Sequence, residues 1–170
     1  MAYTSKARQL EKKLTIKLIF VMKQTIIPFL LLLCSLAVQS YAQQQSSDEA
    51  AIKQVIQSAY IDGIQNGGSS EVIRSGFHPS FNMLRFTDND IKPYAIEDWI
   101  AAIEKRKKEN ATVPPPAVGN FVSVDITGTA AVVKLELFRE NKKTFTDYLV
   151  LYKFTDGWKI VSKTFYRHPN

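Results

Sequence analysis

Cysteine and histidine are scarce in this chain, which has one cysteine and two histidines among its 170 residues. The cysteine, Cys34, lies in an apolar run near the N-terminus, so no thiolate nucleophile, disulfide or cysteine metal site is expected after residue 42. The histidines, His78 and His168, are too few for a multi-histidine metal centre. A glycine-rich phosphate loop, a nucleotide fingerprint and a Ser-His-Asp order are missing too. We therefore expect no metal and no cofactor.

A hydrophobic run long enough to cross a membrane is also missing. The longest apolar stretch covers residues 26–38, contains Pro28, and is shorter than the roughly 20 residues that a transmembrane helix needs. It follows Lys23 and precedes QSYA, in which Ser40 and Ala42 are small residues of the kind that signal peptidase recognises. This pattern predicts a secretory signal peptide with cleavage after Ala42, and it favours that interpretation over a stop-transfer anchor.

An excess of one charge sign is missing once the N-terminal segment is set aside. Residues 1–42 are interpreted as an upstream extension plus the signal peptide, with translation starting at Met1 or Met22, and they hold six basic residues and one acidic residue. The rest of the chain holds sixteen basic and fifteen acidic residues. The basic run at residues 105–108 is typical of a solvated helix end. We expect a periplasmic or extracellular protein, without nucleic acid as a partner and without stable membrane insertion after cleavage.

The apolar positions change from a helical to a strand period after the proline run at residues 114–116. Before it, apolar residues recur every three or four positions and predict three helices, at about residues 48–66, 69–74 and 96–109. Two short strands are expected between the last two helices, at residues 81–86 and 91–94. After the prolines, alternating residues predict four strands joined by hairpin turns, at about residues 121–126, 130–139, 144–154 and 158–166. The order predicts one α+β domain over residues 48–168, after a flexible polar leader at residues 43–47.

The Asp156-Gly157 turn permits two registers for the last hairpin. A two-residue loop pairs residue 153 with 160, and a three-residue loop with Gly157 in a bulge position pairs it with 159. We favour the second, because it sets Phe154 opposite Trp158. It also makes Asp147 and Lys163 diagonal neighbours on one face, within reach of an ion pair. That pair is either a structural feature of the sheet or part of a site, and the sequence leaves both open.

Both faces of this hairpin are largely apolar, although a sheet covered by helices on one side only should alternate apolar with polar residues. The face away from the helices carries aromatic residues that need another cover. A second copy of the chain is the simplest one, and exposed aromatics on a convex sheet are the alternative. We predict a homodimer through Tyr148, Tyr152, Trp158 and Tyr166.

Five residues are candidates for a ligand site: Tyr60, His78, Trp99, Asp147 and Lys163. His78 and Asp147 are also the candidate catalytic bases, and histidine suits this role because it titrates near neutral pH. Tyr60 lies on the apolar stripe of the first helix, so its hydroxyl needs a partner or a cavity. Each has a simpler interpretation as a packing residue, an ion-pair partner or, for His78, a hydrogen-bonding residue at a helix-to-strand corner.

Four segments of the chain resemble one known family: AIKQVIQSAYIDGI, GFHPSFNMLRF, FVSVDITGTAAVVKLEL and FTDYLVLYKFTDGWKIVSKTF. Their pattern resembles the Putative lumazine-binding family of the nuclear transport factor 2-like superfamily, over almost all of residues 48–167. The resemblance implies a cone-shaped α+β fold, with three N-terminal helices packed on a strongly curved, mainly antiparallel sheet around a conical pocket. It also implies dimerisation sheet to sheet. The superfamily mixes enzymes with binding proteins, so the resemblance assigns no reaction.

Three functions fit these observations. The first is an exported protein whose conical pocket binds a small apolar or flat ligand without chemistry. The second is a proton-transfer lyase or isomerase of the ketosteroid isomerase or dehydratase type, with His78 or Asp147 as base and Tyr60 or Lys163 stabilising an oxyanion. The third is a dimeric interaction module with a filled core. We favour the first, which makes the protein a binder rather than an enzyme.

Overall fold

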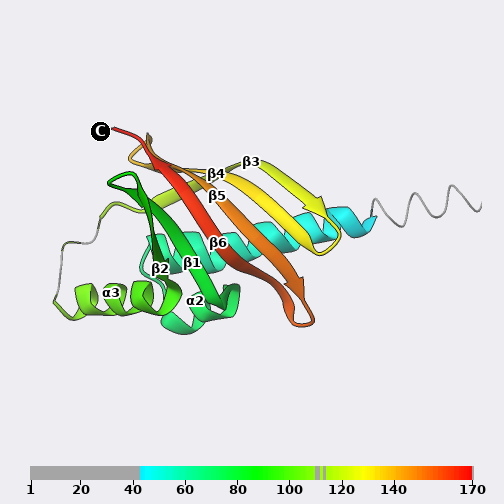
Figure 1. Cartoon of the computed structure of the whole chain (residues 1–170), viewed down its shortest axis with the longest axis horizontal. Coiled ribbons are helices and arrows are strands. Elements are labelled where there is room, and N and C mark those ends of the chain that lie inside the picture. Colours follow the sequence, from blue (N-terminus) through cyan, green and yellow to red (C-terminus); the bar gives the residue numbers. More distant parts are fainter. Residues whose placement is uncertain (1–42, 110–111, 113, 170) are drawn as a thin grey trace, which may run out of the picture. The chain divides into compact units, whose positions relative to one another are not determined.

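The computed structural model describes residues 43–109, 112 and 114–169, and residues 46–170 form one compact unit. The predicted signal peptide lies outside the described residues. The unit is an α+β domain, as predicted, in which helices pack on a six-stranded sheet of order β2-β1-β6-β5-β4-β3 (Figure 1). Only the β1–β6 pair is parallel. The strands are β1 (Phe77–Thr87), β2 (Asp90–Ala95), β3 (Ala117–Thr127), β4 (Ala130–Arg139), β5 (Lys142–Phe154) and β6 (Gly157–Arg167).

The first helix is α-helical over residues 43–55 and continues as a π-helix, η1 (Ile56–Gln65). Residues 43–47, expected as a flexible leader, are therefore helical. The side chain of Asp48 explains why the helix begins so early. Its carboxylate accepts hydrogen bonds from Lys153 Nζ at 2.6 Å and Trp158 Nε1 at 3.1 Å. These contacts fix the start of the helix to the β5–β6 hairpin, so the backbone before Asp48 continues a helix that is already anchored.

The two shorter helices, α2 (Ser70–Gly76) and α3 (Ile96–Lys108), lie on either side of the β1–β2 hairpin in the chain. The three helices therefore do not all precede the strands. The Ser69 hydroxyl caps α2 by accepting the Val72 N–H. At its end Gly76 allows α2 to approach the first helix closely, since a Cβ there would lie 2.3 Å from the Cβ of Ala59.

Three β-bulges interrupt the regular register of the meander. The pairing shifts by one residue near Val122 in β3, Thr144 in β5 and Val161 in β6. Bulges bend the strands that carry them, which produces the strong curvature of the sheet over the helices (Figure 1). The register that we favoured for the last hairpin is confirmed on the side of the bulge at Val161 that is farther from the turn, where Asp147 pairs with Phe165. It is wrong at the turn, where Lys153 pairs with Trp158 instead of Lys159.

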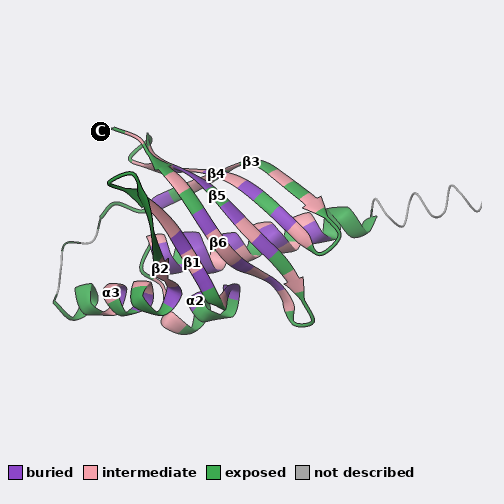
Figure 2. Cartoon of the chain, viewed as in Figure 1, coloured by how far each residue is buried: buried purple, intermediate pink, exposed green. Residues whose placement is uncertain are grey.

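The bulge at Val161 also changes which residues of β6 lie on the outer face of the sheet, and the prediction for this face was partly wrong. One extra residue in β6 turns Trp158 and Ile160 toward the helices, where both are buried. Trp158 therefore does not belong to the exposed aromatic face. Tyr148, Tyr152 and Tyr166 do, and buried and exposed residues alternate along the strands in Figure 2. The outer face is extended by exposed valines at positions 118, 122 and 132.

Candidate functional site

A buried triad of Tyr60, Asp147 and Lys163 lies between the first helix and the sheet. Lys163 Nζ donates to Asp147 Oδ1 at 2.5 Å and to the Tyr60 hydroxyl at 2.7 Å, and that hydroxyl donates to Asp147 Oδ2 at 2.6 Å. Asp147 and Tyr60 are fully buried, and Lys163 is 3% exposed. Each side of this triangle is a short, charge-assisted hydrogen bond, so the three groups hold one another in fixed positions.

The fold brings the triad together from three elements. Asp147 comes from β5 and Lys163 from β6, where the pairs Asp147–Phe165 and Leu149–Lys163 place the two charges diagonally on the inner face. This confirms the diagonal arrangement expected from the sequence. Tyr60 reaches them from η1, where the helix covers this face of the sheet. The sequence leaves open whether these two charges are structural, and the structure adds Tyr60 as their third partner.

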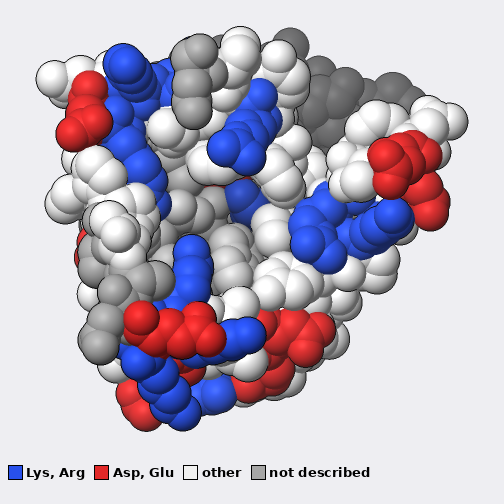
Figure 3. Space-filling model, turned by 90° about the vertical axis from the view of Figure 1, so that its left-hand side faces the viewer, with Lys and Arg blue, Asp and Glu red and all other residues white. Residues whose placement is uncertain are grey.

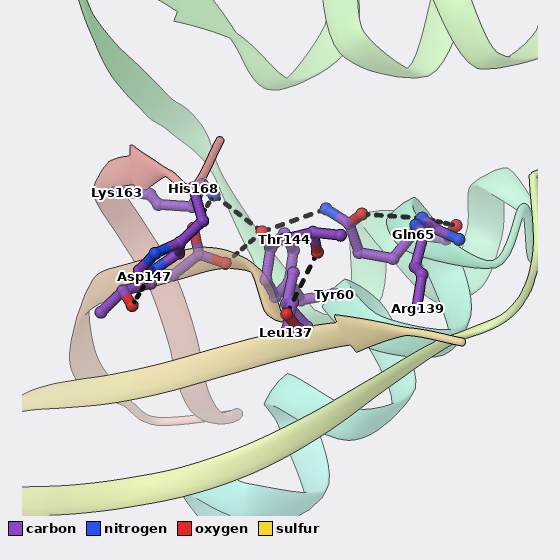
Figure 4. A network of polar contacts seen from close by, with 9 residues as sticks. Tyr60, Gln65, Leu137, Arg139, Thr144, Asp147, Lys163 and His168 are labelled. Carbon is purple, nitrogen blue, oxygen red and sulfur yellow. Dashed lines mark hydrogen bonds and ion pairs between the residues drawn. The ribbon is translucent and has the colours of Figure 1, made fainter. Parts of the chain in front are cut away.

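A second layer of polar contacts extends from the triad (Figure 4). Gln65 Nε2 donates to the Tyr60 hydroxyl at 3.1 Å, and Arg139 Nη2 donates to the Gln65 backbone and side-chain oxygens at 2.9 and 3.1 Å. Arg139 also donates to the carbonyl of Pro115. Arg139, at the end of β4, thus joins the helix end to the connection before β3 and orients the glutamine that contacts Tyr60.

Gln65 could not be predicted from the sequence as a partner of Tyr60, because residues five apart lie on different faces of an α-helix. In the π-helical η1 the repeating backbone hydrogen bond joins residues five apart, which places Gln65 over Tyr60. The helix ends with the same spacing, since the Asn66 N–H donates to the Ile61 carbonyl. A π-helix has no simple sequence signature, so this contact required the structure.

Burial shifts the ionisation of the triad. Desolvation, followed by the charge of Asp147, raises the pKa of Tyr60 well above its ordinary value, so the phenol stays protonated. Desolvation lowers the pKa of Lys163, and the charge of Asp147 acts against that shift. Aromatic rings surround the amine: its Nζ lies 4.7 Å from the centroid of Phe165 and 5.9 Å from that of Trp99. These are cation–π contacts, which stabilise an ammonium, so the lowered pKa of Lys163 comes from burial and not from the rings.

A cavity of about 240 Å³ opens beside the triad. Of the three groups, Lys163 is the one that lines it. Aromatic and aliphatic side chains form most of the described wall together with three cationic residues, and none of the described lining residues carries a carboxylate: Ile64, Gln65, Met83, Trp99, Arg106, Pro114, Arg139, Phe145, Lys163 and Phe165. Figure 3 shows lysine and arginine side chains around a hollow on one side of the molecule.

Arg85 and Tyr94 lie next to Trp99, although neither is among the residues that line the cavity. The guanidinium of Arg85 lies 4.4 Å from the centroid of Tyr94, whose ring is 6.4 Å from that of Trp99. Among the described residues, Arg85 Nε is a buried polar atom without a hydrogen-bond partner. A buried donor without a partner is unusual in a native protein. This edge of the site therefore offers a further free hydrogen-bond donor beside an aromatic surface.

His78 does not lie at this cavity, and its role as a candidate base stays a prediction. Phe77 points into the core, so the next residue along β1 points to the opposite side. There His78 Nδ1 lies 2.6 Å from the Ser80 hydroxyl, and the ring stacks on Phe154 at 4.9 Å. These residues border a separate surface depression with Asp156 and Lys159. The other four predicted site residues, Tyr60, Trp99, Asp147 and Lys163, do come together.

Two further features bear on the class of protein. Within residues 43–109, 112 and 114–169, no group of histidine, cysteine, aspartate and glutamate side chains is arranged to hold a metal ion. Over the same residues, no helix has the length and apolar character needed to cross a membrane.

Solved structures with this fold, and a protein similar in sequence, are known. A protein of unknown function from Silicibacter pomeroyi, described as NTF-2 like, superposes with a TM-score of 0.59 at 18% identity, covering 73% of this chain and 98% of that one. An NTF2-like protein of unknown function from Shewanella baltica gives 0.58 at 25% identity, covering 74% and 97%. Aldolase FrzH from Cladobotryum sp. is 27% identical over 111 residues, which span 65% of this chain and 84% of that protein.

The family assignment rests on a match over most of the folded unit. The model of the family described as Putative lumazine-binding matches residues 47–166, which include the triad and the residues described around the cavity. The solved structures confirm the nuclear transport factor 2-like architecture. This chain belongs to the Putative lumazine-binding family, with the nuclear transport factor 2-like fold.

Proposed function

We propose that the cavity binds a small, flat, largely apolar ligand that carries an acidic group. The composition of its wall supports this most directly, since the wall combines aromatic rings with Arg106, Arg139 and Lys163, and none of its described residues is a carboxylate. Ligand sites generally combine apolar walls with a few placed polar groups. The negative charge closest to the cavity, that of Asp147, is already compensated by Lys163.

The volume limits the ligand to about one substituted ring system. An apolar cavity of about 150 Å³ is large enough to hold benzene, so 240 Å³ leaves space for ring substituents. Trp99, Phe145 and Phe165 offer stacking surfaces, and aromatic rings favour offset or edge-on contacts with another ring. The arginines would then bind a carboxylate or phosphate at the open side.

The test compares 4-substituted benzoates with the matching neutral benzamides by isothermal titration calorimetry. Benzoates should bind more tightly, and Arg106→Gln should weaken benzoate binding by about tenfold, equivalent to about 1.4 kcal/mol. Lys105→Gln is the matched control, since Lys105 lies on the same turn of α3 but does not line the cavity. Equal binding of acids and amides, or equal effects of both variants, would contradict the proposed charge preference.

A second candidate is a lyase or isomerase acting by proton transfer, and the triad favours it. The similarity to a protein named an aldolase agrees with chemistry at a carbonyl compound. In this candidate Asp147 and Tyr60 act on the ligand through Lys163, because Lys163 is the member of the triad that borders the cavity. Isotope exchange at a ligand C–H bond, followed by NMR in heavy water, would distinguish it from simple binding.

Export and dimerisation remain part of the proposal. The signal-peptide pattern over residues 1–42 supports a periplasmic or extracellular location. The exposed aromatic face of Tyr148, Tyr152 and Tyr166 supports a homodimer through the outer side of the sheet, because large exposed apolar patches usually mark an interaction site. Both faces of the sheet would then be covered, one by the helices and one by a second copy.

A further inference from the structure

Lys163 combines features that separate it from an ordinary structural lysine. Its side chain is 3% exposed to solvent but borders a cavity large enough for a small molecule. A lysine ammonium has three N–H donors. Within the described part of the chain, two hydrogen bonds hold it, to Asp147 and Tyr60. The amine is therefore fixed from behind, at the wall of the cavity.

The surroundings favour an amine that can lose its proton. Aromatic rings line the space around Nζ, with Phe165, Tyr60 and Trp99 within 4.7–5.9 Å of it. Burial lowers the pKa of Lys163, and the charge of Asp147 acts against that shift. Asp147, at 2.5 Å, is positioned to take the proton. A desolvated lysine in an apolar pocket is a recognised amine nucleophile.

We infer that Lys163 forms an imine with an aldehyde or ketone group of the ligand that this cavity holds. The inference rests on the proposed function, that the cavity binds a small molecule, and it adds the reacting group of that molecule. The ligand class is thus a flat carbonyl compound with an acidic substituent.

The step balances with groups that are in place. The Lys163 ammonium transfers one proton to Asp147, and the free electron pair on Nζ forms a bond to the carbonyl carbon while the C=O electron pair moves to oxygen. That oxygen takes one proton from Nζ, which gives the carbinolamine. Asp147, 2.5 Å from Nζ, then returns its proton to Nζ, and Nζ passes a proton to the carbinolamine oxygen, which leaves as water. The C=N bond remains with one proton on Nζ, so the net change is carbonyl plus ammonium to protonated imine plus water, with no oxidant or reductant.

Chemical trapping tests the inference on the purified protein. The probe is 4-formylbenzoate, a flat aromatic aldehyde with a carboxylate, added near neutral pH with sodium cyanoborohydride, which reduces an imine to a stable secondary amine. Peptide mass spectrometry then measures labelling at each lysine over time. Lys105, which is 75% exposed, serves as the internal reference for surface lysines. 4-Hydroxymethylbenzoate, which has the same ring and carboxylate but no carbonyl, serves as competitor and as a probe of binding alone.

The inference expects Lys163 to be labelled at least about tenfold faster than Lys105, because the cavity holds the probe with its aldehyde beside the Lys163 amine, whereas a surface lysine meets it only by diffusion. The competitor should protect Lys163 and leave Lys105 unaffected. Tyr60→Phe should slow labelling of Lys163 by up to roughly 10²-fold, because Nζ loses the hydroxyl that holds it in position. Lys163→Arg, which keeps the cation, should lose the protectable label while circular dichroism shows a folded protein.

Other outcomes overturn the inference in distinguishable ways. If calorimetry shows that 4-hydroxymethylbenzoate binds but only surface lysines are labelled, imine formation is refuted and ligand binding stands. Labelling of Lys163 that the competitor does not reduce would also refute it, because the reaction would not depend on the cavity. If neither compound binds and Lys163 is not labelled, the inference and the proposed function both fail for this ligand class.

Discussion

Removing one member of the buried ion pair should destabilise the protein far more than removing both. Asp147 and Lys163 lie in a setting where each charge depends on the other, with their atoms 2.5 Å apart and Asp147 fully shielded from solvent. Breaking such a pair typically costs about 3–5 kcal/mol, because an uncompensated charge stays buried. Domains of this size have a total stability of about 5–15 kcal/mol, so one substitution removes a large part of it.

The structure also predicts which single substitution is worse. In Lys163→Met the Asp147 carboxylate keeps the Tyr60 hydroxyl as a donor but has no cation and no path to solvent. In Asp147→Leu the Lys163 ammonium borders the cavity and can be hydrated there. Lys163→Met should therefore lower the melting temperature by roughly 10–20 °C, and Asp147→Leu by less. The double variant should be close to wild type or more stable, since an apolar pair replaces a desolvated one.

Urea unfolding followed by circular dichroism measures all four proteins and gives the coupling free energy between the two positions. The surface pair of Lys143 and Glu136, at 2.9 Å, is the matched control, and Lys143→Met should change stability little. If the double variant loses as much stability as the two single variants together, the two charges act independently, and the argument from the buried pair is refuted.

Three further predictions concern the site and the outer face. Tyr60→Phe should reduce the loss of stability above about pH 10, because burial and Asp147 raise the pKa of Tyr60 and the folded protein keeps a proton that the unfolded chain releases. The wild type loses up to about 1.4 kcal/mol per pH unit through this group in that range, and equal pH slopes in urea unfolding of both proteins would contradict this. Trp99→Ala should weaken benzoate binding by about tenfold or more in calorimetry, since the ring lines the cavity; unchanged affinity would remove Trp99 from the site. Tyr152→Glu should convert a dimer to a monomer in analytical ultracentrifugation, because it places a charge on the exposed aromatic face; a monomeric wild type would refute the proposed dimer.

The sequence predicted what depends on regular periodicity. Alternating residues located the four long strands and placed Asp147 and Lys163 as diagonal neighbours, because these features depend only on pairing near the middle of the hairpin. The helical stripe likewise directed Tyr60 toward the core. These predictions hold because many apolar residues specify the same face, so a local irregularity does not reverse them.

Local irregularities account for what the sequence did not predict. A single bulge at Val161 moved Trp158 from the outer face to the core, and the π-helical turn set Gln65 over Tyr60. Arg139 is missed for another reason, since its contacts join the ends of elements that lie far apart in the chain. Periodicity carries no information on such contacts. The wall of the cavity is therefore less predictable than the core behind it, although the wall determines what the protein binds.

The location of the buried pair argues that it does more than hold the fold together. A purely structural role could be filled by two apolar side chains, which avoid the desolvation of two charges. Here the pair is set at the wall of a cavity, with its amine toward the ligand space and its carboxylate and phenol behind. The apolar double variant tests this, because it should be more stable than the wild type and should no longer bind a carbonyl compound covalently. That result would mean that the reactive amine lowers the free energy of unfolding of the wild type. Such exchanges of stability for function are common at working sites.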